Sequence, residues 1–189
     1  MGNLKIQMDA KHPNKFLILT DKDVSLFGWK TKEKYHSYYM DISPWNLSDL
    51  FANKDKLGLS IDYDDSIMPI ITNLRAELKL YKDANTIKFL SADDINDLWE
   101  QEGFPYLFPK IEADLHQKRA VLWALKAKKV GCYLEQGTGK TPVGIFILGK
   151  LLNEGLIQKP LVLAPLSLLS NSAWFGDLQK FSDFKPVNL

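Results

Sequence analysis

A glycine-rich loop within LEQGTGKTPVGIFI, residues 134–147, constrains the fold of this chain more than any other feature. The apolar run VGCYL precedes it, and a helix-favouring pattern follows it. Gly137 and Gly139 lack the side chains that would keep the backbone from wrapping closely around a ligand. Lys140 and Thr141 come next, where the helix should begin. The pattern therefore predicts a strand, a tight loop and a helix in succession.

A loop of this kind suits a phosphate group. Backbone N–H groups at a helix N-terminus bind an anion, and the helix dipole favours its charge. We expect Lys140 to reach the β- and γ-phosphates and the Thr141 hydroxyl to coordinate magnesium. The general pattern G-x-x-x-x-G-K-[ST] is not met at its first position, which is Leu134. The alternative is an ordinary glycine-rich turn between a strand and a helix, with a surface lysine.

Helix and strand patterns alternate through the second half of the chain. The sequence predicts helices over 115–128, 140–154 and 167–182, the first of them capped by Asp114. Short apolar runs at 130–134 and 160–166 separate these helices and indicate buried strands. Strands that alternate with helices imply a parallel sheet.

Three segments of this half resemble a known family. LEQGTGKT resembles motif I of superfamily-two helicases, particularly the Swi/Snf-like and phage members, in which the first glycine of the general pattern is commonly replaced. LHQKRAVLWAL resembles the segment of those ATPases that carries a glutamine reading adenine, and this role maps to Gln117. LVLAPLSLLSNSAWFGDLQKF resembles motif Ia, in which a strand ends in Ala-Pro and the next loop approaches the DNA backbone; Ala164, Pro165 and Ser167 match it.

The resemblance, which covers about residues 112–189, implies both a fold and a site. The expected fold is α/β: a partial RecA-like P-loop lobe with parallel strands over 106–189, preceded by a small α+β accessory domain over 1–105. The implied function is the ATP-binding portion of a DNA-dependent ATPase, a helicase or translocase, with ATP and magnesium as cofactors. Nucleotide contacts are expected from Gln117, Gln136, Gly137, Thr138, Gly139, Lys140 and Thr141. Lys140 and Thr141 would be catalytic, Thr141 would bind magnesium, and Pro165 and Ser167 would contact nucleic acid.

Two parts of that family's machinery are not found in the sequence. No Asp-Glu pair follows Thr141, and no second lobe with an arginine finger follows it. Phosphoryl transfer depends on such charged and water-positioning groups. We therefore expect the 189-residue chain to be an N-terminal fragment that binds ATP without turning it over. Two other classes stay open, a non-hydrolysing nucleotide-binding or interaction module and a P-loop enzyme acting on a small molecule.

The first half of the chain carries a different pattern. Alternation over residues 4–20, broken by HPN, predicts a β-hairpin. Helices are predicted after Ser43, over 67–81 and over 91–103, with Ser91 as a cap. Pro105 and Pro109 interrupt the pattern, so a domain boundary is expected near residue 105.

Charge and composition narrow the functional classes. Lys and Arg number 14 against 17 acidic residues in 1–110, but 10 against 6 in 111–189, which suits a nucleotide or polyanion partner. No run approaches the roughly 20 apolar residues that cross a bilayer. The single cysteine, Cys132, lies in an apolar stretch and is expected to be buried. We expect a cytoplasmic protein of a bacterium or a phage-infected host.

A second nucleic-acid candidate lies in FGWKTKEKYHSYY, where Trp29, Tyr35, Tyr38 and Tyr39 interleave with lysines. Aromatic side chains can stack on bases while lysines contact phosphates. The alternative is a half-buried pair of strands with solvated lysines. The pair of strands is the favoured interpretation, because alternating patterns usually indicate sheets.

Overall fold

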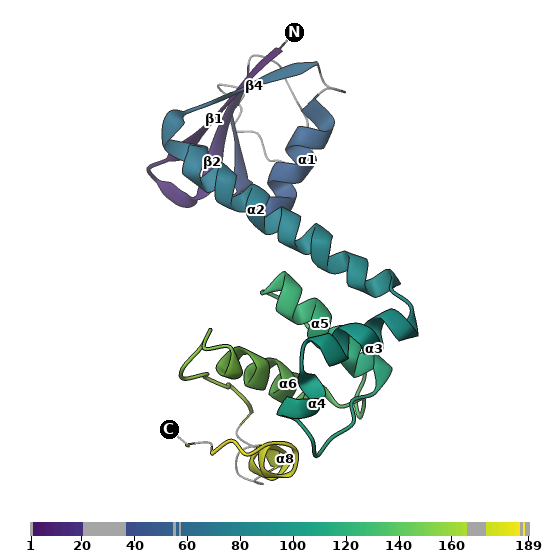
Figure 1. The fold of residues 1–189 in the computed structure, drawn as a ribbon. Coiled ribbons are helices and arrows are strands. Elements are labelled where there is room, and N and C mark those ends of the chain that lie inside the picture. The colour runs from purple at the N-terminus through teal and green to yellow at the C-terminus, as the bar shows by residue number, and fades with distance from the viewer. Residues whose placement is uncertain are drawn as a thin grey trace. The chain divides into compact units, whose positions relative to one another are not determined.

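The chain folds as two compact units, Met1–Leu80 and Tyr81–Leu189. The computed structural model describes residues 2–20, 37–54, 56, 58–165, 173–185 and 187. Figure 1 shows a sheet with helices beside it in the first unit and a group of helices in the second, so the fold is mixed α/β as expected. No helix in these ranges is long and apolar enough to cross a membrane.

The first unit is built on a four-stranded sheet with the order β3-β2-β1-β4. Its strands are β1 (Gly2–Asp9), β2 (His12–Thr20), β3 (Ser37–Asp41) and β4 (Leu59–Tyr63). β1 pairs antiparallel with β2, which confirms the predicted hairpin, and β2 pairs antiparallel with β3. β4 pairs in parallel with β1. The sequence analysis did not predict this edge strand, although LSIDY alternates between apolar and polar residues and its burial follows that alternation.

Alternation along the strands puts the core of this unit on one face of the sheet. Leu4 and Ile6 of β1 and Phe16 and Ile18 of β2 are buried. They share one cluster with side chains of two helices and of a short 3₁₀ helix, which are α1 (Pro44–Lys54), α2 (Met68–Asn85) and η1 (Asp65–Ile67). The helices predicted after residue 43 and over 67–81 are therefore confirmed.

Two predicted serine caps lie at helix starts. The Ser43 hydroxyl accepts a hydrogen bond from the N–H of Asn46 at 3.1 Å, just before α1. The Ser91 hydroxyl accepts from the N–H of Asp94 at 3.1 Å, and the Asp94 carboxylate accepts from the Ser91 N–H at 3.1 Å. Each bond satisfies an N–H group that has no partner within its own helix. These helices therefore begin where the sequence predicted.

All regular elements among the described residues of the second unit are helices. These elements are η2 (Thr86–Phe89), α3 (Ala92–Gln101), α4 (Phe104–Leu107), α5 (Leu115–Ala127), α6 (Lys140–Asn153) and α8 (Ala173–Phe181). The predicted helices at 91–103, 115–128 and 140–154 are thus confirmed. The helix predicted over 167–182 is found from residue 173 onward, and residues 166–172 lie outside the described ranges.

The two parallel strands predicted for this unit are not formed. Residues 130–134 and 160–165 are neither strand nor helix, and no strand occurs among the described residues from 81 onward. Tyr133 is 98% exposed and Leu163 is 87% exposed. A parallel strand is stable only with neighbours that pair with its backbone and cover both its faces, and the described residues supply none. A RecA-like lobe is therefore not confirmed, and Cys132 is exposed rather than buried as expected.

Aromatic side chains form the centre of the second unit. Trp99 of α3 stacks on Phe104 with ring centroids 3.9 Å apart. Phe146 of α6 meets Trp99 edge to face at 5.2 Å and Phe108 at 4.9 Å. Because α3 and α4 share this core with α5 and α6, the compact unit begins before the boundary expected near residue 105.

A buried ammonium holds the C-terminal part of α6. Lys150 is 8% exposed, and its Nζ lies 2.7 Å from a Glu102 carboxylate oxygen and 3.0 Å from a Glu154 carboxylate oxygen. It also donates to the Glu102 carbonyl at 2.7 Å. Burial lowers the pKa of Lys150, but the hydrogen bonds and charges of the two glutamates outweigh burial and raise the pKa above the ordinary lysine value. Because Lys150 belongs to α6 and Glu102 directly follows α3, this ion pair ties α6 to the end of α3.

Two glycines of α6 offer a matched test of the packing. A Cβ at Gly144 would meet nothing within 4 Å, whereas a Cβ at Gly149 would clash with the Phe108 ring. We expect Gly144→Ala to stabilise the protein by about 0.5–1 kcal/mol, because alanine favours a helix interior over glycine. Gly149→Ala is expected to lower the free energy of unfolding by about 1–3 kcal/mol through overpacking. Urea unfolding followed by circular dichroism measures both, and equal effects of the two substitutions would contradict the packing described.

Candidate functional site

The glycine loop, residues 134–141, leads directly into α6. Gly139 is the N-cap residue, with φ 80° and ψ 44°, and Gly137 has φ 84°. Both φ angles lie in the left-handed region, so these positions favour glycine over any residue with a Cβ. Lys140 follows as the first residue of the helix. The helix after the loop is as predicted, but the segment before it is irregular rather than a strand.

The lysine of the glycine loop contacts the loop's own carbonyl groups. Lys140 Nζ donates to the Leu134 carbonyl at 2.6 Å and to the Glu135 carbonyl at 2.8 Å. The Thr138 hydroxyl also donates to the Glu135 carbonyl, at 2.7 Å. An anion at this loop would therefore have to draw the ammonium away from two carbonyl oxygens.

The N-terminus of α5 contacts the glycine loop through two side chains. His116 Nε2 lies 2.9 Å from the Thr138 carbonyl oxygen, and Gln117 Nε2 donates to the same oxygen at 3.3 Å. Gln117 Oε1 accepts a hydrogen bond from the N–H of Asp114 at 3.0 Å. The structure thus brings Gln117 to the loop. His116 was not predicted as a site residue, and its position beside Gln117 is the signal that could have found it.

The close approach of α5 leaves position 139 without room for a side chain. A Cβ built at Gly139 would clash with Gln117 Nε2, whereas a Cβ at Gly137 would meet nothing within 4 Å. A side chain at position 139 would be strained by the φ angle and would also displace the Gln117 amide. Gly137 is required by its φ angle alone.

The remaining nucleotide candidates lie at the same place. Thr141 is the second residue of α6 and is half-buried, and Gln136 is exposed in the loop. Among the described residues, no group of three or more His, Cys, Asp or Glu side chains could hold a metal ion. The Thr141 hydroxyl can supply one oxygen ligand to Mg²⁺, which in proteins usually keeps several waters and is bound in part by substrate phosphates. Loop N–H groups, an ammonium and a hydroxyl together suit an anion or its magnesium complex.

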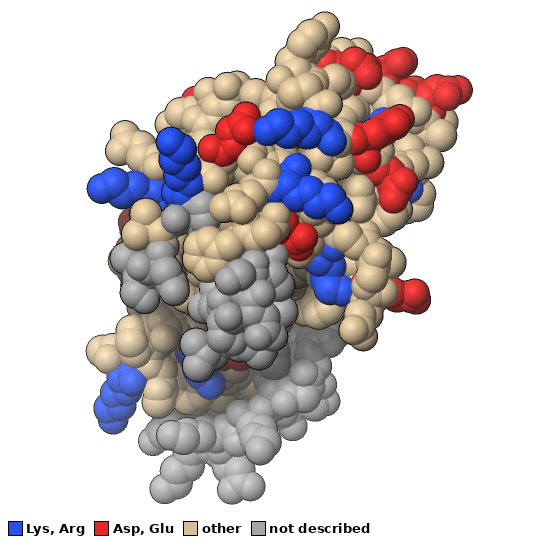
Figure 2. Space-filling view, turned by 90° about the horizontal axis from the view of Figure 1, so that it is seen from below, with Lys and Arg blue, Asp and Glu red and all other residues tan. Residues whose placement is uncertain are grey.

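The residues predicted to contact nucleic acid are only partly described. Pro165 is exposed in an irregular segment, and Ser167 lies outside the described residues. Trp29 and Tyr35 also lie outside them, whereas Tyr38 is 1% exposed in the core of the first unit. Tyr38 therefore follows the sheet interpretation of that stretch. On the face shown in Figure 2, basic side chains are interspersed with acidic ones rather than gathered in one continuous field.

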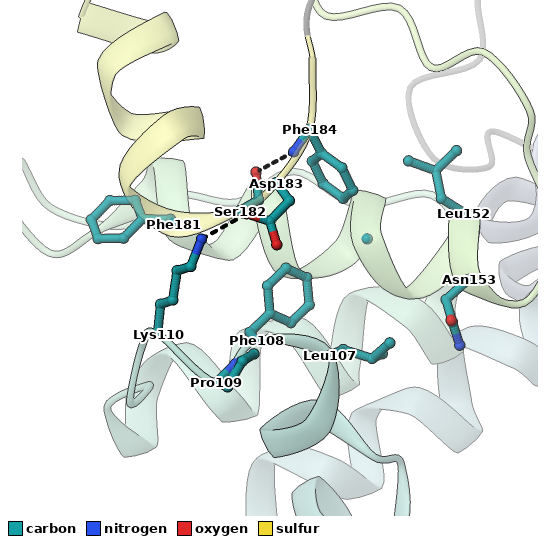
Figure 3. Close-up of a pocket in the computed structure, with 11 residues that line it drawn as sticks. Leu107, Phe108, Pro109, Lys110, Leu152, Asn153, Phe181, Ser182, Asp183 and Phe184 are labelled. Carbon is teal, nitrogen blue, oxygen red and sulfur yellow. Dashed lines mark hydrogen bonds and ion pairs between the residues drawn. The ribbon is translucent and has the colours of Figure 1, made fainter.

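A pocket of about 340 Å³ lies at the other end of α6, near its C-terminal turn (Figure 3). Phe108, Gly149 and Phe184 line it, and on its wall Lys110 Nζ pairs with a carboxylate oxygen of Asp183 at 2.6 Å. Its lining is mainly apolar, and the charges of this ion pair already satisfy each other. The glycine loop, rather than this pocket, therefore has the groups that anion chemistry needs.

Comparison of the chain with protein-family models, with curated proteins and with solved structures finds no match.

The two loop glycines allow the approach of α5 to be tested by a double-mutant cycle. Gly137→Ala and Gly139→Ala should each lower the free energy of unfolding by about 1–2 kcal/mol, because both positions have a left-handed backbone conformation that disfavours a Cβ. Gly139→Ala should be the more costly, since its Cβ also meets Gln117. Truncation of that side chain by Gln117→Ala should relieve part of the loss at position 139 and none of the loss at position 137.

Chemical unfolding of the single and double variants measures this coupling. Equal coupling of Gln117→Ala to both glycines would show that the contact with Gly139 is not specific.

Proposed function

We propose that the glycine loop binds the phosphate groups of ATP, as part of a DNA-dependent ATPase of the helicase or translocase class. The observation that supports this most is the start of α6. Gly137 and Gly139 have left-handed backbone conformations, and Lys140 follows them as the first residue of the helix. The helix dipole and the free N–H groups of a first helical turn favour a negatively charged ligand at this point. An anion seated there would also meet the Lys140 ammonium.

The proposed roles follow from where the side chains lie. Lys140 would leave the carbonyls of Leu134 and Glu135 and bind the β- and γ-phosphates. The Thr141 hydroxyl would hold the magnesium ion that accompanies them. The backbone from Gln136 to Gly139 would surround the phosphates, and Gln117 lies against that backbone.

Contact with DNA is supported by the sequence more than by the geometry. Residues 111–189 carry 10 basic against 6 acidic side chains, and LVLAPLS resembles motif Ia, so Pro165 and Ser167 are the proposed contacts. The exposed apolar side chains of Tyr133, Leu161 and Leu163 fit strands that lack neighbours in the described structure. We therefore include in the proposal a parallel sheet that these two segments would join.

Two other functions remain as alternatives. A non-hydrolysing nucleotide-binding or interaction module would bind ATP without turnover even in the presence of DNA. A P-loop enzyme acting on a small molecule would bind nucleotide but would not respond to nucleic acid. Binding of DNA therefore distinguishes the helicase or translocase class from a P-loop enzyme that acts on a small molecule.

Removing the loop ammonium tests nucleotide binding directly. We expect Lys140→Ala to weaken binding of ATP with magnesium by at least about tenfold, because a charge-assisted hydrogen bond contributes about 1.5–3 kcal/mol. Isothermal titration calorimetry gives the affinity, and circular dichroism checks that the variant is folded. Lys159→Ala is the control, since it removes the same charge from an exposed residue outside the loop. Equal ATP affinity of the Lys140→Ala variant and the unaltered protein would refute the assignment.

Binding of DNA is the second expected outcome. Fluorescence anisotropy of labelled single-stranded and duplex oligonucleotides should detect association at low salt. The affinity should fall as salt rises, because phosphate contacts release counterions. No association with either oligonucleotide at low ionic strength would favour the small-molecule enzyme instead.

A further inference from the structure

The contact between α5 and the glycine loop suggests a role for two neighbouring side chains, and this inference rests on the proposed binding of phosphate. We propose that His116 and Gln117 are positioning residues that hold the Thr138 carbonyl and so set the glycine loop for the phosphate chain of any nucleotide. Gln117 then acts on the loop and does not select the base. Its role thus differs from the adenine reading that its sequence context implies.

The Thr138 carbonyl receives two donors from one helix. His116 Nε2 lies 2.9 Å from this oxygen and Gln117 Nε2 lies 3.3 Å from it. A carbonyl oxygen only accepts hydrogen bonds, and it has two lone pairs for them. His116 must therefore carry a proton on Nε2, either as that neutral tautomer or as the imidazolium. The two side chains together can satisfy both lone pairs of the oxygen.

Holding this carbonyl also fixes the next backbone donor. A peptide bond is planar and trans, so the Gly139 N–H points opposite to the Thr138 C=O. With the carbonyl held toward α5, rotation of the peptide between residues 138 and 139 would break both hydrogen bonds. Two left-handed glycines flank Thr138, and glycine gives the backbone more freedom than any other residue. The contact with α5 therefore keeps a flexible loop in one orientation.

The amide of Gln117 has both ends engaged. Its Oε1 accepts from the Asp114 N–H at 3.0 Å, and its Nε2 donates to the Thr138 carbonyl. The side chain is only 8% exposed, and Nε2 occupies the space that a Cβ on Gly139 would need. The amide keeps a second N–H and a second lone pair beyond these two hydrogen bonds, but with 8% of the side chain exposed, little of either can reach a base. Gln117 therefore joins the start of α5 to the glycine loop.

A positioning role and a base-reading role of Gln117 predict different ligand preferences. A residue that reads adenine contributes to binding of ATP and little to binding of GTP or of inorganic tripolyphosphate. A residue that positions the loop contributes to all three, because they share the phosphate chain. Tripolyphosphate is the most direct probe, since it has no base and no sugar.

The experiment compares His116→Phe and Gln117→Met with the unaltered 189-residue chain. Both substitutions are neutral and similar in size, so they remove donors without adding charge near a phosphate. Calorimetry with ATP, GTP and tripolyphosphate, each with magnesium, gives the affinities. We expect each variant to lose about 2- to 12-fold in affinity, the range of one ordinary hydrogen bond, and by a similar factor for all three ligands. His116→Gln retains a side-chain N–H donor and should restore most of the affinity lost in His116→Phe.

The three ligands separate loop positioning from phosphate binding. Loss of affinity confined to ATP, or no loss in either variant, would overturn the positioning role while leaving phosphate binding intact. Failure of the unaltered chain to bind any of the three ligands would instead refute the proposed function, and the positioning role with it. Thermal unfolding of each variant shows whether it is folded, and rescue by His116→Gln excludes a merely structural effect of residue 116.

Discussion

The packing of Phe146 against three aromatic rings is the contact on which the second unit depends. Phe146 meets Trp99, Phe104 and Phe108 edge to face, and all four side chains are buried. Aromatic pairs with this geometry contribute about 0.5–1.5 kcal/mol each beyond the area that they bury. The contact places α6 against α3 and α4, and the glycine loop leads into α6. The candidate site therefore depends on a core that lies more than one helical turn away from it.

The two ends of α6 are held in different ways. At the C-terminal end, Lys150 is buried between Glu102 and Glu154, which ties the helix to the end of α3. At the N-terminal end, hydrogen bonds from α5 reach the Thr138 carbonyl, just before the helix starts. The first arrangement buries the Lys150 ammonium beside two carboxylates that are exposed, whereas the second leaves Lys140 exposed. A well-held helix with a polar, accessible start is suited to binding an anion.

The irregular segments on either side of α6 differ from the strands of the first unit. Tyr133, Leu161 and Leu163 expose large apolar side chains, unlike the alternating strands β1 and β2, whose apolar side chains enter a core. Their sequences favour strands, but a strand needs partners for its backbone and cover for its faces, and the described residues provide neither. A strand pattern thus produces a strand only where such partners are present. Helices α5 and α6 form here because their backbone hydrogen bonds are internal.

Local signals in the sequence determined the helices, the hairpin and the start of α6. Alternation along β1 and β2, the capping position at Ser91 and the glycines before Lys140 all act within a few residues, so they could be predicted without a fold. Tertiary structure alone decided the parallel pairing of β4 with β1 and the inclusion of α3 in the second core. It also decided that His116 and Gln117 meet Thr138, a contact between residues 22 and 21 positions apart. No local pattern encodes such contacts, because they depend on how helices pack once their apolar faces are buried.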